Sequence, residues 1–469
     1  MRPVILLSIG AISSAPLRAQ DSTVLHSVNR YVESERARQR IPGISVAILR
    51  GDRVLLARGY GMANVELGVP ASDSTIYQSG SVGKQFTAAA VVMLAEQGRL
   101  GLDERITRWL KEGNGVWDGI SVRHLLTHTS GMAEYADSTF DYRKDYTENQ
   151  LVRFAASRPL DFPPGDKWNY SNTGYLLLGV LIHRVTGRFY GDVLRDMIFA
   201  PLGMKSTRII SEADIVPNRS AGYRLVGNQL KNQEWVSPSL NTTADGALYF
   251  SVKDLAKWAV GLNRQRTPSA KVLKEAWTPV RLNDGGVYPY GFGWGLSEQR
   301  AHPRIGHTGS WQGFTTAIHR YPEFDLTVVV LANLAEAHSG ALAQAIAGIL
   351  EPAVQPPQLL ATTLPGPSTP TPIPDLLHRI AAADSGGVTA GLHRSLLPLA
   401  RNDLGMALRD VKSWTALGCE GAAGRGITKL DATIEHICYA RGVGKGRRVI
   451  FSVFYSGGWR AGYFEYQDY

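Results

Sequence analysis

The chain has 469 residues, of which 44% are hydrophobic and 19% are charged, and its formal net charge is +9. This length exceeds what one hydrophobic core usually organises, so we expect two or three domains of a globular protein. The basic residues are spread along the sequence, which argues against a nucleic-acid partner, because such proteins gather their positive charge on one face.

The first twenty residues resemble a short secretory signal. Arg2 precedes an apolar run over residues 4–12, and small residues follow up to a plausible cleavage point after Ala19. The run is too short to span a bilayer. We therefore predict that residues 1–19 are removed, which lowers the net charge to +7 through the loss of two arginines. The mature protein is then expected to be periplasmic or secreted, with no stable membrane insertion.

The N-terminal third of the mature chain predicts a helix, a hairpin and a second helix. Apolar residues recur at helical spacing over residues 22–40, and two strand-like runs then flank Gly51-Asp52, a typical hairpin turn. The second helix is expected from about Ser81 to Gln97, where a small polar cluster leads into an apolar run.

Ser81 and Lys84 stand at the start of that second helix. Residues three apart share a helix face, so the Lys84 amine can point at the Ser81 hydroxyl. Burial lowers the pKa of a lysine and makes it a usable base, and the exposed N–H groups of a helix start favour an oxyanion. Alternatively, Ser81 caps the helix and Lys84 extends to solvent. The segment alone favours neither explanation.

Residues 104–203 are predicted to form a helical insertion broken by Pro and Gly, and the tripeptide Tyr-Ser-Asn at 170–172 lies within it. A tyrosine near a lysine can relay protons, and an asparagine amide can orient a substrate carbonyl. By itself, however, such a tripeptide is far more often a loop or a helix cap.

A third polar segment, "GHTGSWQGF" at 306–314, comes just before strand-like residues 315–334. Gly309 would let a substrate backbone approach, the Ser310 N–H can bind an oxyanion, and His307 can bind a carboxylate or assist proton transfer. The alternative is a glycine-rich turn that leads into a strand.

Two further patterns carry weaker signals. The glycine-rich "GGVYPYGFGWG" at 285–295 lacks the Gly-Lys-Ser/Thr ending of a phosphate loop, so no nucleotide is expected, and its aromatic residues either line a cleft or pack in the core. His124 and His128 have the spacing of zinc-binding histidines, but no Glu follows His124. A structural role is favoured, and no metal site is expected.

The composition changes sharply after about residue 351. Residues 352–374 contain eight prolines and predict an extended linker. Residues 375–469 then suggest one or two helices followed by antiparallel strands, which is a small separate α+β domain. Its Cys419 and Cys438 are the chain's two cysteines and can form one disulfide in an oxidising compartment, although the sequence does not show whether they do.

Taken together, the three polar segments and their surroundings resemble the penicillin-recognising serine hydrolases. The resemblance is to the group of class C β-lactamases, D-alanyl-D-alanine carboxypeptidases, esterases and D-aminopeptidases, and it covers about residues 22–351. It rests on the segments already named and on "SVRHLLTHTSGM", "FPPGDKWNYSNTGYLLLGVLI", "PLGMKSTR" and "YGFGWG". The resemblance implies an α/β sandwich, with an antiparallel sheet flanked by helices, over residues 20–351.

The resemblance also implies a role for each polar residue. Ser81 would be the acylating nucleophile, Lys84 its base, and Tyr170 a partner in proton transfer. The backbone N–H groups of Ser81 and Ser310 would form the oxyanion hole. His307 would take part in catalysis, and the remaining substrate-binding residues would be Asn172, Thr308 and Gly309.

Two departures from the family pattern bear on activity. Class C β-lactamases usually carry Lys where this chain has His307, which puts efficient β-lactam hydrolysis in doubt. Asp245 and Gly246 stand where many relatives have a Gly-Gly pair, with an effect on the cleft floor that the sequence does not define.

The sequence therefore predicts a serine hydrolase that needs no cofactor and acts on a small-molecule or peptide substrate, with D-amino-acid peptidase or esterase activity ahead of β-lactamase activity. A non-catalytic binding or assembly module on the same fold is a further alternative, because folds persist after their chemistry is lost. The substrate, the task of the C-terminal domain and the oligomeric state are not evident from the sequence.

Overall fold

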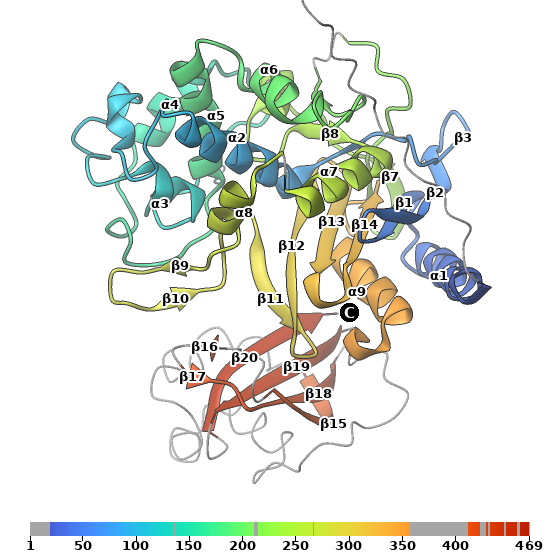
Figure 1. Cartoon of the computed structure of the whole chain (residues 1–469). Coiled ribbons are helices and arrows are strands. Elements are labelled where there is room, and N and C mark those ends of the chain that lie inside the picture. Colours follow the sequence, from blue (N-terminus) through green and yellow to red (C-terminus); the bar gives the residue numbers. More distant parts are fainter. Residues whose placement is uncertain are drawn as a thin grey trace, which may run out of the picture.

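A computed structural model describes residues 19–135, 137, 139–210, 214–265, 267–356, 411–422, 428–429, 432–444, 447–456 and 460–468. At its centre lies a seven-stranded antiparallel sheet with the order β11-β12-β13-β14-β1-β2-β3 (Figure 1). Its strands are β1 (Gly43–Arg50), β2 (Arg53–Asn64), β3 (Val69–Pro70), β11 (Gly295–Gln299), β12 (His302–Trp311), β13 (Phe314–Tyr321) and β14 (Leu326–Ala332).

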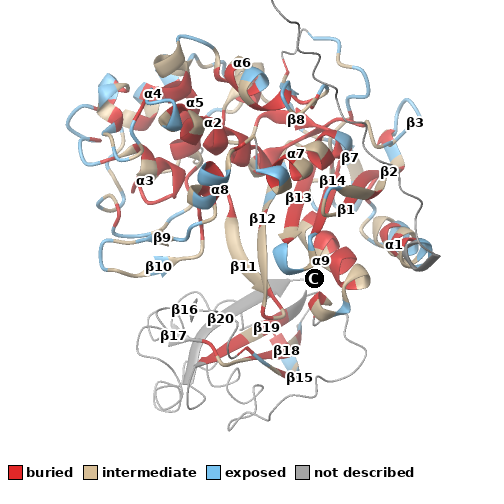
Figure 2. Cartoon of the chain, viewed as in Figure 1, coloured by how far each residue is buried: buried red, intermediate tan, exposed pale blue. Residues whose placement is uncertain are grey.

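Both faces of the central strands are buried. In β1, Ile44, Val46 and Ile48 belong to one apolar cluster, whereas Ala47 and Leu49 belong to the other. Successive side chains of a strand point to opposite faces, so a continuous apolar run such as "ISVAIL" is what a sheet covered on both sides requires. Figure 2 shows this burial through the sheet and the helices that cover it.

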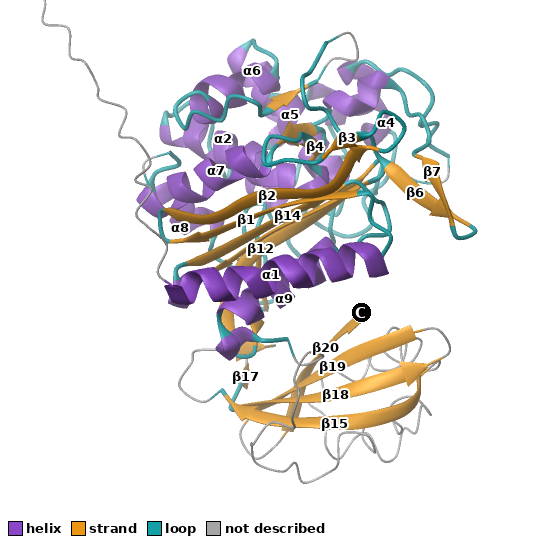
Figure 3. Cartoon of the chain, turned by 90° about the vertical axis from the view of Figure 1, so that its right-hand side faces the viewer, coloured by secondary structure: helices purple, strands orange, loops and turns teal. Residues whose placement is uncertain are grey.

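Helices cover the two faces of the sheet from different parts of the chain. One face packs against α1 (Ala19–Arg38) and α9 (Ser339–Leu350), which come from the two ends of the main domain (Figure 3). The other face packs against α2 (Lys84–Glu96), α7 (Val252–Arg264) and a largely helical region. The fold is therefore the α/β sandwich that the sequence predicts.

The helical region matches the insertion predicted over about 104–203. Its longest helix is α5 (Asn172–Thr186), whose residues 173–182 are all buried. The other elements are η2 (Ile106–Arg108), η3 (Lys111–Gly113), α3 (Val122–Leu126), α4 (Glu148–Ala156), α6 (Tyr190–Leu194) and η4 (Arg195–Phe199), followed later by α8 (Ala270–Ala276).

Short strands connect these layers. β4 (Tyr77–Gln78) pairs with β8 (Leu248–Phe250), which also pairs with β5 (Arg208–Ile209). Two further hairpins are formed by β6 (Tyr223–Val226) with β7 (Gln229–Asn232) and by β9 (Val280–Arg281) with β10 (Val287–Tyr288). The β4 pairing matters for the site, because β4 leads directly into the segment that carries Ser81.

The C-terminal region forms a second, smaller antiparallel sheet with the order β15-β18-β19-β20. Its strands are β15 (Val411–Gly421), β18 (His436–Gly444), β19 (Arg447–Ser456) and β20 (Arg460–Asp468), and β16 (Thr428–Lys429) pairs with β17 (Ala432–Thr433). Cys419 and Cys438 face each other across β15 and β18 and form a disulfide, which answers the question left open by the sequence.

The smaller sheet contacts the main sheet at the turn between β11 and β12. Ala301 of this turn is fully buried in an apolar cluster with residues of β15, β18 and β19. Next to it, Arg300 forms an ion pair with Glu420 at 3.1 Å. Both turn residues have positive φ, 51° at Arg300 and 58° at Ala301, which is the conformation of a tight hairpin turn.

Several sequence predictions lie outside the described residues. These are most of the signal peptide, most of the proline-rich linker, and the helices expected between 375 and 410. The domain boundaries therefore stay predictions. Among the helices that the structure describes, none combines the length and the apolar character needed to cross a bilayer.

Candidate active site

Ser81 lies in a 3-10 turn, η1 (Gly80–Gly83), immediately before α2. The Ser79 N–H donates to the Leu248 carbonyl at 2.7 Å and so ties the turn to β8. The sequence predicts that Ser81 opens the α-helix itself, whereas the α-helix begins at Lys84. The turn leaves Ser81 partly exposed while its neighbours Val82 and Gly83 are buried.

Lys84 is fully buried, so it does not extend to solvent as the alternative explanation required. Its Nζ lies 3.0 Å from Ser81 Oγ, 2.8 Å from Asn172 Oδ1 and 2.5 Å from the Asp245 carbonyl oxygen. The structure thus brings the predicted pair together and adds Asn172 as a direct neighbour of the lysine. The contact with Asp245 was not predicted, because a backbone carbonyl has no signature in the sequence.

Asp245 is fixed by its side chain as well. The Tyr135 hydroxyl donates to Asp245 Oδ2 at 2.9 Å. The adjacent Gly246 packs against Gly80, where an added Cβ would lie 3.2 Å from the Gly80 carbonyl carbon. Asp245 thus replaces the first glycine of the family's Gly-Gly pair with a residue whose side chain is held by Tyr135 and whose carbonyl contacts Lys84.

Tyr170 lies in the extended segment just before α5, where Ser171 caps the helix by accepting a hydrogen bond from the Gly174 N–H. The Lys84 amine lies 5.0 Å from the centre of the Tyr170 ring. Within the described part of the chain, the Tyr170 hydroxyl is buried and has no hydrogen-bond partner. It is therefore available to a bound substrate.

His128 supports Tyr170 from behind. The two rings pack against each other with their centres 4.2 Å apart and their planes tilted by 35°, and His128 Nδ1 accepts a hydrogen bond from the Ser171 N–H at 3.1 Å. Burial, followed by the charges of Lys84 and His307, holds the pKa of His128 well below its usual value. His124 instead closes the capping box of α3. The zinc-like spacing of the two histidines thus has a structural explanation in each case.

His307 uses both of its ring nitrogens within the protein. Nδ1 lies 2.6 Å from the Thr308 carbonyl oxygen, which can only accept, so Nδ1 carries the proton. Nε2 then accepts from the Tyr290 hydroxyl at 2.9 Å. Burial is the main cause that lowers the pKa of His307 to about 4, and the charge of Lys84 adds to it. The ring is therefore neutral at physiological pH.

Tyr290 is a site residue that the sequence did not single out. The sequence analysis left its segment undecided between cleft lining and core packing, and the structure shows both, because Tyr290 is 5% exposed yet contacts His307. In the same segment, a Cβ on Gly293 would lie 2.9 Å from the Lys84 carbonyl carbon. The glycines of "YGFGWG" thus allow this chain segment to pack on the start of α2.

The backbones around Ser81 and Ser310 approach each other closely. A Cβ on Gly309 would lie 2.3 Å from the Ser79 carbonyl oxygen and 2.7 Å from the Ser81 amide nitrogen. A Cβ on Gly80, whose φ is +49°, would lie 2.4 Å from the Ser310 amide nitrogen. Glycine at both positions is therefore required for η1 to contact β12. This contact brings together the two amides predicted to form the oxyanion hole.

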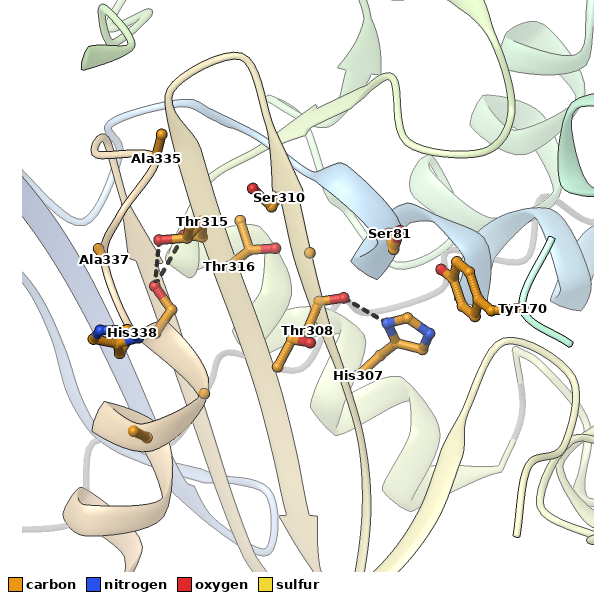
Figure 4. Close-up of a pocket in the computed structure, with 14 residues that line it drawn as sticks. Ser81, Tyr170, His307, Thr308, Ser310, Thr315, Thr316, Ala335, Ala337 and His338 are labelled. Carbon is orange, nitrogen blue, oxygen red and sulfur yellow. Dashed lines mark hydrogen bonds between the residues drawn. The ribbon is translucent and has the colours of Figure 1, made fainter. Parts of the chain in front are cut away.

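A cavity of about 640 Å³ opens beside these residues. Ser81, Tyr170 and His307 lie together beside β12, and the cavity extends across that strand to the start of α9 (Figure 4). Its lining comprises Ser81, Tyr170, His307, Thr308, Gly309, Ser310, Thr315, Thr316, Ala335, Ala337, His338, Ser339, Gly340 and Ala341. All predicted site residues except Lys84 and Asn172 line it, and those two lie directly behind Ser81. In the described residues, no group of His, Cys, Asp or Glu is arranged to hold a metal ion.

Comparisons with known proteins agree with this arrangement. The Beta-lactamase family model matches residues 28–351. Penicillin-binding protein 4* of Bacillus subtilis is 30% identical over 310 residues, which cover 62% of this chain and 68% of that protein. D-aminopeptidase of Gluconobacter oxydans is 27% identical over 319 residues, 66% of this chain, and the match spans 59% of that protein.

A solved structure extends the likeness to the whole fold. The octameric penicillin-binding protein homologue from Pyrococcus abyssi matches with a TM-score of 0.64 at 24% identity, over 94% of this chain and 95% of that chain. The family match and the penicillin-binding protein and D-aminopeptidase relatives indicate a serine hydrolase of the peptidase or amidase type. The chain belongs to the Beta-lactamase family.

Proposed function

We propose that the protein hydrolyses amide or ester bonds of D-amino-acid-containing substrates through an acyl-enzyme on Ser81. The observation that carries this proposal is the buried Lys84 amine 3.0 Å from Ser81 Oγ at the edge of the cavity. A nucleophile within hydrogen-bond reach of an oriented base is the arrangement that acyl transfer requires.

The surroundings of Lys84 orient its lone pair. The Asn172 side-chain oxygen and the Asp245 carbonyl can only accept hydrogen bonds, so they take the two N–H groups of a neutral amine. The remaining lone pair then points to the third neighbour, the Ser81 hydroxyl. As Ser81 Oγ bonds to the substrate carbonyl carbon, its proton passes to Lys84 and the Ser81 and Ser310 amides bind the oxyanion.

Tyr170 completes the proposed cycle. Its unpartnered hydroxyl lines the same cavity as Ser81, where it can give a proton to the leaving amine or alcohol as the bond to the carbonyl carbon breaks. Lys84 then passes the proton that it took from Ser81 to the Tyr170 oxygen, which restores the neutral tyrosine. Water attacks the ester on Ser81, gives up a proton along the same route, and releases the acid with Ser81 regenerated.

The proposed substrate class rests on the relatives and on His307. One relative is named a D-aminopeptidase and another a penicillin-binding protein. The neutral His307 supplies no positive charge at the position where β-lactamases of this family usually have lysine. Peptidase, amidase or esterase activity is therefore proposed ahead of β-lactamase activity. The close Ser81–Lys84 contact argues against a purely non-catalytic module.

The test is covalent labelling. The wild type, Ser81→Ala and a control Ser310→Ala are incubated with a fluorophosphonate or a labelled penicillin, and intact mass is measured. We expect one adduct on the wild type and on Ser310→Ala, which keeps its backbone N–H, and none on Ser81→Ala. Turnover of paired D- and L-amino-acid amides should favour the D series. Labelling or turnover that survives in Ser81→Ala would refute the mechanism.

We also propose that the protein is exported. The N-terminal sequence and the disulfide between Cys419 and Cys438 support this, because disulfides persist mainly in oxidising compartments. N-terminal sequencing of the protein from periplasmic and extracellular fractions of an expressing cell should show a start near residue 20. Recovery only as the full-length chain from the cytoplasm would contradict export.

A further inference from the structure

A second cavity, of about 210 Å³, adjoins the one beside Ser81. The two share His307 and Thr308, so the second continues the first along β12 toward the turn with β11. Its lining is Tyr290, Gly295, Ser297, Arg304, Gly306, His307, Thr308 and His319. Nothing in the proposed mechanism uses this space.

Arg304 brings a positive charge to the second cavity. Its Nε donates to Ser297 Oγ at 3.1 Å and a terminal nitrogen donates to Gln299 Oε1 at 3.4 Å, and both acceptors are neutral. Among the residues that the structure describes, no carboxylate lies within ion-pair distance of Arg304. Arg304 also forms a hydrogen bond with the Tyr321 hydroxyl. Because a guanidinium has five N–H donors, these three bonds leave capacity for a further acceptor.

His319 lies beside Arg304 in the same cavity. It is 4% exposed, and its Nδ1 has no hydrogen-bond partner in the described part of the chain. It faces Gly306 across the β12–β13 pairing, where an added Cβ would lie 2.7 Å from His319 Cδ2, so the glycine makes room for the ring. Burial, followed by the charge of Arg304, holds the pKa of His319 well below its usual value. The ring is thus a neutral donor beside a cation.

We propose that the second cavity is a subsite for a carboxylate at the end of a peptide substrate, held by Arg304 and His319. A guanidinium next to a neutral N–H donor suits a carboxylate, which accepts at both of its oxygens. This inference rests on the proposed peptidase function and narrows its substrate class.

The position of Arg304 sets the length of the substrate. Arg304 precedes Thr308 by four residues on β12, which corresponds to about 13 Å along an extended strand. The Arg304 side chain does not shorten this distance, because its guanidinium bonds Ser297, which pairs with Arg304, and Gln299, which lies nearer the β11–β12 turn. A carboxylate held at Arg304 therefore lies about 13 Å or more beyond Thr308, which about four extended residues span. A single amino-acid amide or a β-lactam is too short to reach it.

The experiment compares leaving groups of different length and charge. N-acetyl-D-alanyl peptides with one, two, three or four residues after the scissile bond are made with a free C-terminal carboxylate or a carboxamide. We measure kcat and KM for the wild type, Arg304→Gln and Arg304→Lys. Arg58→Gln serves as the matched control, because Arg58 is an exposed arginine of β2 in the same sheet. Hydrolysis of a short neutral ester and the melting temperature report whether each variant is folded.

For the wild type we expect kcat/KM to favour the carboxylate over the carboxamide by about tenfold or more with the four-residue leaving group, mainly through KM. Arg304→Gln should bring this ratio to about one while leaving ester hydrolysis within about twofold. Arg304→Lys should retain part of the ratio, because it keeps the charge and loses the planar fork. Arg58→Gln should leave the ratio unchanged.

The subsite is refuted if the wild-type ratio of kcat/KM for carboxylate over carboxamide is near one, or if Arg304→Gln keeps a high ratio. Neither result contradicts the proposed function as long as turnover depends on Ser81. If the wild type hydrolyses none of the peptides, the subsite is tested by calorimetric binding of the peptides with a four-residue leaving group, as carboxylate and as carboxamide, to Ser81→Ala. Equal affinity for the two overturns the subsite. Tighter carboxylate binding that Arg304→Gln removes supports it, even though the peptidase assignment then fails.

Discussion

Lys84 is placed by three oxygen atoms, and two of them belong to groups that can only accept. This asymmetry gives the neutral amine one orientation, with its lone pair on Ser81. The lysine is also fully buried, so bulk water does not compete for these contacts. Orientation and burial together suit it to the role of general base.

Asn172→Ala tests the orienting role of the amide oxygen. With one acceptor removed, the Lys84 amine can rotate, so we expect kcat to fall by about 10- to 100-fold while KM changes little. Steady-state kinetics on a D-amino-acid amide measures the change. Asn149→Ala, at an exposed position of α4, is the control and should match the wild type. Equal kcat for Asn172→Ala and the wild type would show that the amide does not orient the base.

His128 is proposed to position Tyr170, and two variants separate its two contacts. His128→Asn keeps an acceptor for the Ser171 N–H and tolerates the positive φ of 60°, whereas His128→Phe keeps a ring packed against Tyr170 and loses the acceptor. We expect both variants to lower kcat by about tenfold and to shift its pH profile. A fall in melting temperature with an unchanged kcat and pH profile would instead assign a purely structural role.

At the scale of elements, the site depends on the contact between η1 and β12. The two elements contact each other through their backbones, because Gly80 and Gly309 have no side chains to keep them apart. The contact explains why the serine lies in a tight turn before α2 and why the glycine of "HTG" has no substitute.

Gly309→Ala tests this contact. An added methyl group would lie 2.3 Å from the Ser79 carbonyl oxygen, so η1 must move away from β12. We expect a loss of stability of about 2 kcal/mol or more and a fall in kcat of at least about 100-fold. Denaturant unfolding and kinetics measure both effects. Gly421→Ala, where nothing lies within 4 Å, is the control and should be close to neutral.

The elements of the main domain could be predicted from the sequence, but part of the site could not. Periodicity predicts helix 22–40 and the hairpin at Gly51-Asp52. The resemblance to the penicillin-recognising serine hydrolases, and not the local motifs alone, indicates Ser81, Lys84 and Tyr170. The Asp245 contact with Lys84 is made by a backbone carbonyl, which any residue provides. Tyr290 lies in a glycine-rich segment that packs on the start of α2, which is about 200 residues earlier in the sequence. The Asp245 contact and the position of Tyr290 both depend on tertiary structure, which a local sequence pattern does not reveal.

At the scale of the whole molecule, buried neutral histidines tie stability to pH. His128, His307 and His319 all have a pKa below the ordinary value, and that of His307 falls from 6.5 to about 4. Below pH 6.5 the unfolded chain binds protons that the folded protein does not bind. Acid therefore favours unfolding.

We expect the free energy of unfolding to be nearly constant above about pH 6.5, as far as these histidines are concerned, and to fall as the pH drops toward 4. Urea unfolding at pH 7.5, 6 and 5 measures this. His307→Gln removes one of the three groups and should make the decline shallower. His26→Gln, at an exposed position of α1, should leave the slope as it is. Equal slopes for His307→Gln and the wild type would contradict the assignment of a neutral His307.

The turn at Arg300 and Ala301 has a practical consequence for shortening the chain. A version that ends before β15 would expose an alanine that is now fully buried and would leave Arg300 without Glu420. It would also keep two non-glycine residues in a left-handed turn without the packing that now surrounds them. Changing the pair to Asn-Gly, which this turn favours, should make such a minimal catalytic fragment easier to produce.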